Sequence, residues 1–478
     1  MSTKIAAVLM LILTLDIGYF VERQHFTHLI IAYSLMFGAY FYILKQKQNL
    51  QQVRIVKKLL FVGILLRGVL LFSTPNLSED IYRFIWDGRL IHLSINPFNF
   101  KPSYFVENHL FSETLTPQLF QLLNSKNYFT VYPPVCQAVF AVAVWLFPTS
   151  VYGSLVVIKG FLFLCEIGTI YLMFKMLKDK SKVLIYALNP LIIIELCGNV
   201  HFEAAMIFFF LWAIYILRNT FSKVENFWKG LGTSAAFFAL SVASKMLPLL
   251  FLPFFSKRLG LKKSLFYFTG IGLFLLLLFS PLYNAVFINN IKTSLNLYFQ
   301  KFEFNASVYY VYSFIEIWRW GFNPILNISK VLMGVVFISI ILLAVFEKNF
   351  KISNFNFQLS NLENTVTSER DDDESVKETN FSEAFFEKCL FAISIYFLCA
   401  AIVHPWYAAL PLAISIFTRF RYIMVWTCLL PFTYIHYSYP KPTENFWVIG
   451  AEYVLVIGVF IFEKVKTDPL SIFRKKTN

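Results

Sequence analysis

Apolar runs long enough to cross a bilayer recur along the whole chain, and they constrain its fold more than any other feature. A helix needs about 20 apolar residues to span the hydrocarbon core. The runs lie near residues 4–20, 27–44, 56–73, 152–174, 183–198, 202–217, 264–283, 325–346, 387–403, 422–438 and 446–462. Backbone groups in lipid must be paired within their own segment, and the alternating pattern of a β-barrel is absent. We therefore predict an all-α polytopic membrane protein in which residues 1–478 form one transmembrane domain.

Composition supports this class, because hydrophobic residues make up 58% of the chain and the mean hydropathy is +0.61. The first apolar run lacks a small-residue cleavage site, so we expect it to be retained as a helix rather than removed as a signal peptide.

Basic residues gather in the short connections between the apolar runs. They lie in 45–58, 175–182, 218–229, 257–263, Arg419–Arg421 and the tail from Lys464. Lys and Arg in short loops stay on the cytoplasmic side of the membrane. The formal net charge of +14 therefore indicates topology and contact with anionic membrane lipid, and nucleic acid is not an expected partner. With this polarity both termini are cytoplasmic and the chain makes roughly 12–14 passes.

Two apolar stretches do not fit a simple count of passes. The run from Val135 to Phe147 is too short for a comfortable span, so we expect it to be re-entrant or interfacial. Lys245 interrupts a second run that begins and ends beside basic loops. Two shorter helices that meet outside near Lys245, with Pro248 at the break, would satisfy the polarity. Residues 348–385, which contain the run SERDDDES, are expected to form a flexible cytoplasmic loop.

An outer loop at residues 74–132 is too long to be a mere connector. Ser78 is a good N-cap for a helix, and Asp80, Arg83 and Asp87 share one stripe of that helix. Its apolar surface comes from Ile81, Phe84, Ile85 and Trp86. The pattern predicts an amphipathic helix at the membrane surface. Acids are favoured in any first helical turn, so Glu79 and Asp80 alone would fit a purely structural role.

Other unusual polar groups are predicted on the same outer side. They are Asn199, His201 and Glu203 at a turn between two helices, Lys245 at the break, Asn305 before a helix, and His404, Trp406 and Tyr407 at a helix junction. Polar groups at membrane depth are costly and mark functional sites. A lone interfacial histidine such as His404, or the Trp406–Tyr407 pair, is more often an aromatic-belt anchor than part of a site. The set as a whole indicates a site that faces outward.

Familiar soluble-enzyme motifs are missing. The sequence contains no G-x-x-x-x-G-K-[ST], G-x-G-x-x-G, H-E-x-x-H or G-x-S-x-G, which argues against nucleotide-binding, zinc-protease and serine-hydrolase sites. Its six cysteines lack C-x-x-C spacing, so we expect thiols in the core rather than a zinc site or a disulfide framework.

The chain resembles GT-C superfamily glycosyltransferases, in particular the bacterial mannosyltransferase-like members that use polyprenyl-phosphate sugars. The matching elements are SEDIYRFIWDGRLIHLSINPF, YPP at Tyr132–Pro134, NPL followed by GNVHFEAAM at 189–206, SKMLPLLFLPF at 244–254, FNASVYY at 304–310 and HPWY at 404–407. They occur in family order over most of the chain.

This resemblance implies a transferase of the bacterial plasma (inner) membrane whose site faces the periplasm. It implies a polyprenyl-phosphate sugar donor, with mannose as the expected sugar, and a lipid or glycan acceptor. An acidic residue of the first large outer loop then acts on the acceptor, and Glu79–Asp80 occupies that position. Whether a divalent cation assists stays open, because an isolated acidic pair does not decide it.

Elementary chemistry agrees with such a reaction. A carboxylate can take the proton of the acceptor hydroxyl, and Asp80 is preferred over Glu79 because it shares the stripe of Arg83. Direct displacement by the acceptor oxygen, assisted by one base, proceeds with inversion and needs no second carboxylate as nucleophile. The leaving phosphate needs cationic groups, which Lys245, Arg83, Arg89 and His201 can supply. The full set predicted to bind substrate is Arg83, Asp87, Arg89, Tyr132, Asn199, His201, Glu203, Lys245, Asn305, His404, Trp406 and Tyr407.

Two other classes compete with the enzyme. A polytopic lipid or polysaccharide transporter or flippase would also have many helices and intramembrane charges, but transporters usually show related halves and midplane sites, and no convincing repeat is found. A membrane scaffold would not require Asn199, His201 and Lys245 to converge.

Overall fold

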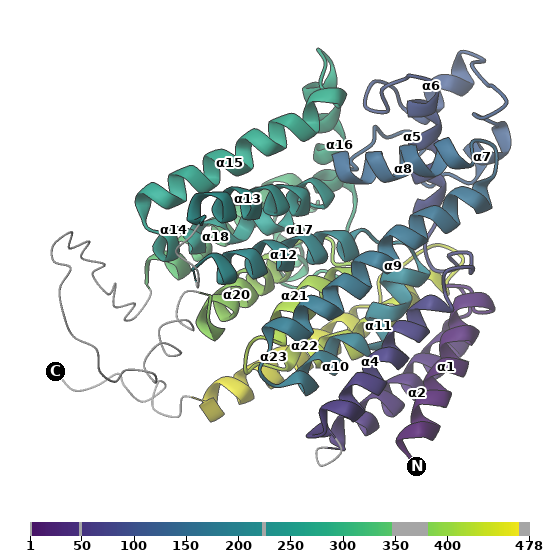
Figure 1. Cartoon of the computed structure of the whole chain (residues 1–478). Coiled ribbons are helices and arrows are strands. Elements are labelled where there is room, and N and C mark those ends of the chain that lie inside the picture. The colour runs from purple at the N-terminus through teal and green to yellow at the C-terminus, as the bar shows by residue number, and fades with distance from the viewer. Residues whose placement is uncertain (1, 47–49, 222–225, 347–380, 468–478) are drawn as a thin grey trace.

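The computed structural model describes residues 2–46, 50–221, 226–346 and 381–467, and its helices run side by side for most of their length (Figure 1). The first half contains α1 Thr3–Tyr19, α2 Phe26–Lys45, α4 Val53–Gly68, α5 Asp80–His92, α6 Pro102–Glu107, α7 Pro117–Gln121, α8 Pro134–Leu146, α9 Val151–Met176, α10 Val183–Ala187, α11 Pro190–Ile192, the π-helix η2 Ile193–Gly198 and α12 Glu203–Phe221. The second half contains α13 Phe227–Ser244, η3 Leu247–Phe251, α14 Leu252–Leu259, α15 Leu261–Phe279, α16 Phe287–Lys301, α17 Val308–Trp320, α18 Ile325–Val345, α20 Glu383–Cys399, η5 Pro405–Ala408, α21 Ala409–Ser415, α22 Tyr422–Leu429, η6 Leu430–Tyr437 and α23 Phe446–Thr467.

The predicted all-α, polytopic class is confirmed. Among the residues described, no strand occurs, and the sole β-pairing is an isolated bridge between Phe304 and Ile402. Within the described ranges, six helices are long and apolar enough to cross a membrane, or seven if one bent pair is counted as a span. They are Phe26–Lys45, Val151–Met176, Glu203–Phe221, Leu261–Leu282, Ile325–Val345 and Phe446–Lys466. The other passes of the predicted 12–14 would use shorter or broken helices, and their crossing stays a prediction.

Several predicted spans are interrupted in the structure. The run at 183–198 is a pair of helical pieces bent by 54°, because Pro190 opens a new helix that Asn189 caps through its side chain. The run at 422–438 changes from α22 to the 3-10 helix η6. The break predicted at Lys245 is confirmed, since α13 ends at Ser244 and Lys245 is extended, with φ −163° and ψ 136°. Proline and polar residues inside these runs prevent one continuous helix.

The outer loop folds into a compact layer at one end of the bundle, where α5, α6, α7 and α8 gather at the upper right of Figure 1. Helix α5 begins at Asp80 with Glu79 as its N-cap, one residue later than the expected cap Ser78. The Ser78 hydroxyl still accepts a hydrogen bond from the Asp80 backbone N–H at 3.3 Å. Helices α5 and α8 pack closely at Gly88, where an added Cβ would lie 2.6 Å from the Phe140 carbonyl oxygen.

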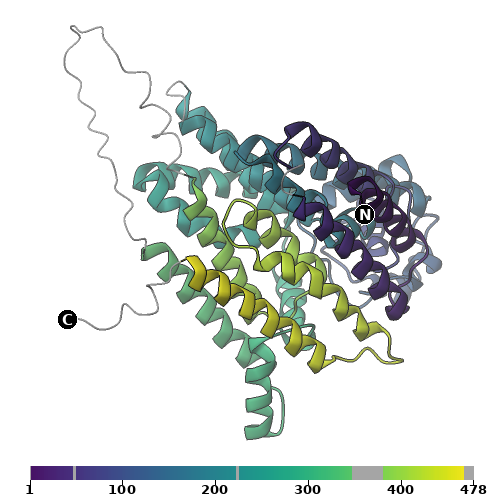
Figure 2. The same cartoon turned by 90° about the horizontal axis from the view of Figure 1, so that it is seen from below.

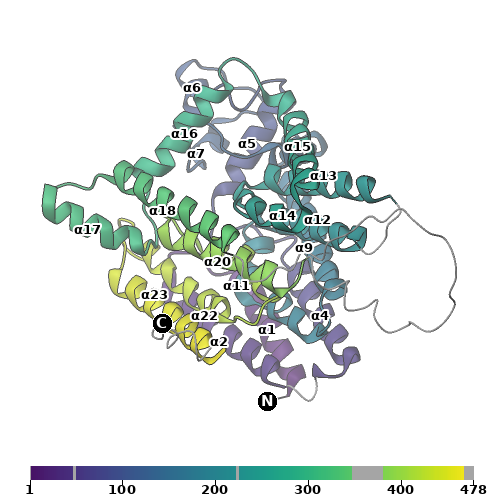
Figure 3. The ribbon, with the colours of Figure 1, turned by 90° about the vertical axis from the view of Figure 1, so that its left-hand side faces the viewer.

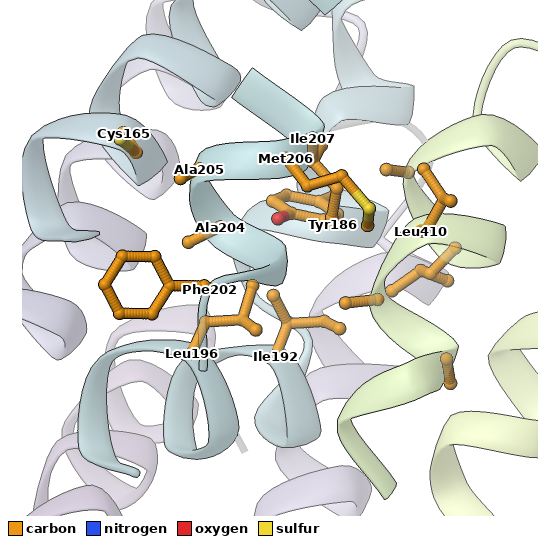
Figure 4. Close-up of a cluster of buried hydrophobic side chains, with 14 of the residues drawn as sticks. Cys165, Tyr186, Ile192, Leu196, Phe202, Ala204, Ala205, Met206, Ile207 and Leu410 are labelled. Atoms are coloured by element: carbon orange, nitrogen blue, oxygen red, sulfur yellow. The ribbon is translucent and has the colours of Figure 1, made fainter. Parts of the chain in front are cut away.

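The apolar core lies between the two halves of the chain. Figure 4 shows Ile192 and Leu196 packed against the start of α12, with Leu410 of α21 on the other side. Helices α22 and α23 return to the side of α1 and α2, as Figures 2 and 3 show, and η6 contacts α2. This return brings Tyr437 of the C-terminal quarter beside Arg23, which lies between α1 and α2.

The predicted flexible loop at 348–385 lies mostly outside the described residues. The structure describes only 381–385 of it, where α20 begins at Glu383 and Phe385 is fully buried. That end of the segment therefore belongs to the helical core rather than to a loop, because its phenylalanines supply apolar surface for packing.

Topology can be tested directly with reporter fusions. A reporter fused after Lys182 or Lys263 is expected to lie in the cytoplasm, and one inserted near Asn108 is expected outside, because Lys and Arg stay on the cytoplasmic side. The turn from α14 to α15 lies at the left of Figure 1, away from α5–α8. Accessibility to a membrane-impermeant label is the measurement. An outside signal at Lys182 would contradict the expected polarity and move the site.

Candidate active site

An aromatic stack forms the centre of the candidate site. The imidazole of His201 lies on the indole of Trp406, with ring centroids 3.7 Å apart and planes inclined by 14°. The imidazole of His404 stacks on the same indole at 4.4 Å and 9°. His404 precedes η5 and His201 precedes α12, so two segments far apart in sequence meet here. Two of the predicted histidines are thus brought together around a predicted tryptophan.

The surroundings of His404 disfavour its charged form. Burial lowers the pKa of His404 to about 3, and the positive charges of His201, Lys245 and His436 act in the same direction. His404 is therefore a neutral ring at physiological pH, which can accept or donate a hydrogen bond without adding charge to the site.

Lys245 lies at the edge of this stack. Its ammonium group forms an ion pair with the buried carboxylate of Glu203 and lies 4.5 Å from the centre of the Tyr407 ring. The side chain of Lys245 is 30% exposed, whereas that of Glu203 is only 2% exposed. The cation is consequently held at an open position by a carboxylate beneath it, where it can bind an incoming anion.

Asn305 and Phe304 connect the stack to the C-terminal helices. The Phe304 carbonyl accepts a hydrogen bond from the Val403 backbone N–H at 2.8 Å, and the Phe304 ring lies 4.9 Å from His404. Asn305 adopts a positive φ of 47°, and its side chain donates to Glu452 at 3.1 Å. Asn305 is fully buried, so the structure places it behind the stack rather than beside Lys245.

The acidic pair of the outer loop joins this network through an arginine. Arg23 donates to Glu79 at 2.5 Å, and its guanidinium lies 4.7 Å from the centre of the Tyr437 ring. The Tyr437 ring is in turn 6.3 Å from Phe304. The contacts therefore run from Glu79 through Arg23, Tyr437 and Phe304 to the stack around Trp406.

Asp80 occupies the first position of α5 and is partly exposed. One of its carboxylate oxygens accepts a hydrogen bond from the Asn124 side chain at 2.9 Å. Glu79 is committed to Arg23, whereas Asp80 is held by a neutral amide. This difference suits Asp80 better to accept a proton.

The other charged residues of α5 fasten the outer loop. Arg83 forms an ion pair with Asp87 at 2.8 Å and donates to the backbone carbonyls of Ser125 and Tyr128. Arg89 donates to the carbonyl of Thr114 and, at 2.8 Å, to that of Thr149. All three side chains are 2% exposed or less. These contacts give Arg83, Asp87 and Arg89 a structural role, and their binding of substrate stays a prediction.

Tyr132 also belongs to the support of the outer loop. Its ring packs edge-on against Phe84 of α5 at 4.8 Å, and Phe84 packs against Phe202 at 5.7 Å. The Asn199 side chain accepts a hydrogen bond from the Leu77 backbone N–H at 3.3 Å. Helix α5 is thereby anchored to the turn that carries His201 and Glu203.

Sequence reasoning missed several members of the network. Arg23 and Tyr437 were not singled out, nor was Glu195, which lies 3.4 Å from the His201 Nε2 atom. The same holds for His436, whose ring lies 5.1 Å from Phe304, and for its ion-pair partner Glu444. The signal for Glu195 was available, because an acid inside an otherwise apolar run is unusual at membrane depth. Arg23 and Tyr437 stand next to apolar helices at their outer ends, where charged and aromatic residues are common, so their sequence context carried no such signal.

Two hollows open beside the network. One of about 590 Å³ is lined by Gln24, His25, Phe26, Thr27, His28, Ile435, Ser438 and Tyr439. Another of about 650 Å³ is lined by Tyr439, Pro440, Lys441, Thr443, Glu444, Asn445, Phe446 and Trp447. Arg23 and Tyr437 directly precede lining residues of the first hollow, which therefore reaches the link to Glu79. In the described part of the chain, no group of three or more His, Cys, Asp or Glu side chains could hold a metal ion.

Comparison with known families gives one match. A family model described as "Alpha-(1->6)-mannopyranosyltransferase, N-terminal domain" matches residues 11–259. That region contains α5, the turn with His201, and Lys245, and it ends where α14 ends. Neither the curated proteins nor the solved structures include a match to the chain. The residues from the second half, including His404 and Trp406, lie beyond the matched region.

Proposed function

Since the chain belongs to the alpha-(1→6)-mannopyranosyltransferase family, we propose that it transfers mannose from a polyprenyl-phosphate donor to a lipid or glycan acceptor on the outer face of the bacterial inner membrane. Membership makes the protein a membrane mannosyltransferase, which decides for an enzyme over the transporter and the scaffold. The donor, the acceptor and the orientation are the proposed parts.

One observation carries the proposal: a cationic, aromatic cluster and an acidic pair share one continuous network. His201 stacks on Trp406, Lys245 lies over the neighbouring Tyr407, and Glu79 is linked to this cluster through Arg23 and Tyr437. A cation near a phosphate stabilises the negative charge that develops as the leaving group departs. A carboxylate at the opposite end can act on an acceptor hydroxyl.

The proposed reaction is a single displacement. The acceptor oxygen attacks the anomeric carbon of mannose while the bond from that carbon to the phosphate oxygen breaks. Asp80 takes the acceptor proton, and polyprenyl phosphate leaves with the bonding electron pair. Displacement by one nucleophile inverts the anomeric centre, so an α-linked product requires a donor in which mannose is β-linked to phosphate.

Access from the membrane supports a lipid donor. Lys245 is partly exposed at the break between α13 and η3, among helices whose outer surfaces are apolar. A lipid phosphate could reach this cation from the bilayer, whereas a nucleotide sugar is confined to the cytoplasm. The hollow next to Arg23 offers a separate approach for the acceptor.

Purified protein is expected to transfer mannose from β-linked polyprenyl-phosphate mannose and to be inert with a nucleotide mannose. Transfer of radiolabelled mannose to a mannoside acceptor, followed by linkage analysis, is the measurement. The α-linked donor anomer serves as a matched control and should give no product. Efficient turnover from a nucleotide sugar in the absence of lipid intermediates would contradict the proposal.

A further inference from the structure

Glu195 is a buried carboxylate that the proposed reaction does not yet use. It lies in the π-helix η2, within the bent helix pair, and is 0% exposed. Its neighbours Ile192 and Leu196 pack into the apolar core shown in Figure 4. A charged group in such surroundings is costly unless it is compensated, and π-helical segments occur often at functional sites. Its partners therefore matter.

Several polar groups surround this carboxylate, among them the phenol of Tyr33. Tyr434 donates its hydroxyl proton to one oxygen at 2.7 Å, and Asn199 donates to the other at 3.2 Å. The His201 Nε2 atom lies 3.4 Å from that second oxygen. Among the described residues, Glu195 forms an ion pair with His201. His201 can therefore neutralise the Glu195 carboxylate by accepting a proton.

The His201 ring is held from two sides. Trp406 covers one face at 3.7 Å, and Glu195 faces a ring nitrogen. The preceding residue, Val200, has a positive φ of 58°, which is unfavourable for a β-branched residue. Strain of this kind persists where the surrounding structure requires a particular geometry. The turn thus places one imidazole between an indole and a carboxylate, and both neighbours favour a cation.

A second buried glutamate shows what a purely structural arrangement looks like. Glu166 is also 0% exposed, accepts from the Tyr186 hydroxyl at 2.7 Å and pairs with Arg67 at 2.8 Å. Arginine stays charged at every physiological pH, so Glu166 is neutralised permanently. Glu195 has a titratable partner instead, and its compensation depends on the protonation of His201.

We propose that Glu195 is a positioning residue of the transferase site, which orients His201 and stabilises the protonated imidazole that binds the phosphate of the donor. This inference rests on the proposed function, because it assigns the group that the imidazolium would serve. The imidazolium adds a positive charge next to Lys245 without a second fixed cation. After the bond from mannose to the phosphate has broken, loss of the proton from His201 would weaken the attraction of the imidazole for the polyprenyl phosphate product.

The other groups near His201 do not supply this effect. Lys245 and His436 carry no negative charge that could attract an imidazolium. His404 is neutral, since its pKa is lowered to about 3. Glu203 is already paired with Lys245. The phenols of Tyr33 and Tyr434 near Glu195 ionise only at alkaline pH. Among these neighbours Glu195 is the group that favours a charged His201.

The test compares Glu195→Gln with Glu166→Gln in the full-length enzyme. Glu195→Gln is expected to lower kcat/KM for β-linked polyprenyl-phosphate mannose by about 10- to 100-fold at neutral pH, the scale of breaking one partner of a buried charge pair. A neutral amide no longer favours the imidazolium, which then loses its proton at a lower pH. The alkaline limb of the kcat/KM profile should therefore move to lower pH.

Glu166→Gln should reduce thermal stability and leave the alkaline limb of the kcat/KM profile where it is in the wild type. The double variant Glu195→Gln/His201→Ala should be no slower than His201→Ala, because both changes disable the same Glu195–His201 pair. An unmoved limb in Glu195→Gln, or additive losses in the double variant, would overturn the inference. If Glu195→Gln does not accumulate, Glu195→Asp keeps the charge and should lower the rate with the limb in place. A wild-type rate in Glu195→Asp would count against positioning.

Failure of the proposed function would look different. Wild-type protein would then show no transfer from polyprenyl-phosphate mannose at any pH, whatever the variants do. Wild-type transfer with an unmoved alkaline limb in Glu195→Gln would leave the function standing and remove the role of Glu195.

Discussion

Asp80→Asn is expected to lower kcat by a factor of about one hundred or more, the usual scale for loss of a general base. Asparagine has nearly the shape of aspartate and can keep the contact with Asn124, whose amide now donates to Asp80 at 2.9 Å. The variant should therefore fold and insert normally. Single-turnover transfer from a preloaded lipid donor measures the chemical step, and thermal unfolding in detergent measures the fold.

Glu79→Gln is the matched control for this prediction. It removes the ion pair with Arg23, whose partners are 27% and 43% exposed, so the loss of stability should be no more than about 1 kcal/mol. The rate should fall much less than in Asp80→Asn. If Glu79→Gln abolishes transfer while Asp80→Asn does not, the two roles must be exchanged. If both variants stay active, the segment is only a capped helix and the base lies elsewhere.

Lys245→Met should be the second large effect, with kcat/KM for the donor reduced by about a hundredfold or more. A cation preorganised at a developing phosphate charge is worth roughly 10²- to 10³-fold in rate. The loss should appear with the lipid donor at every acceptor concentration, because Lys245 acts on the leaving group. Lys245→Arg keeps the charge and should lose considerably less.

The stability cost of Lys245→Met can be separated from its effect on transfer. Removing the ammonium group leaves the Glu203 carboxylate, 2% exposed, without its partner, which costs about 1–3 kcal/mol. The double variant Lys245→Met/Glu203→Gln should regain most of that stability and stay as slow as the single variant. Full recovery of transfer in the double variant would mean that Lys245 only neutralises Glu203.

The class of fold and the break at Lys245 could be predicted from the sequence because both depend on local composition. Apolar length identifies a helix in lipid, and a charged residue followed by Pro248 identifies an interruption. The same local reasoning was less accurate at the outer loop. It predicted a helix at the membrane surface, and the structure buries Arg83, Asp87 and Arg89 beneath partners 25 to 60 residues away.

Local pattern also picked out a set of polar groups at helix ends; that these ends face outward stays a prediction. His201, His404, Trp406 and Lys245 do converge in the structure. Asn305 turned inward to Glu452, because its positive φ directs the side chain into the packing of the C-terminal helices. Local pattern identifies the polar residues of an apolar chain but not the direction in which each one faces.

The sequence by itself determined a helical membrane protein and the interruption at Lys245, because hydropathy, proline and charge act within a few residues of themselves. Only the tertiary structure decided which groups touch. Arg23 reaches Glu79 across 56 positions, and Tyr434 reaches Glu195 across 239. Such contacts arise from the packing of whole helices, whose order around the bundle no local property encodes. The charge of a buried group depends on these distant partners, and so does the chemistry proposed for His201.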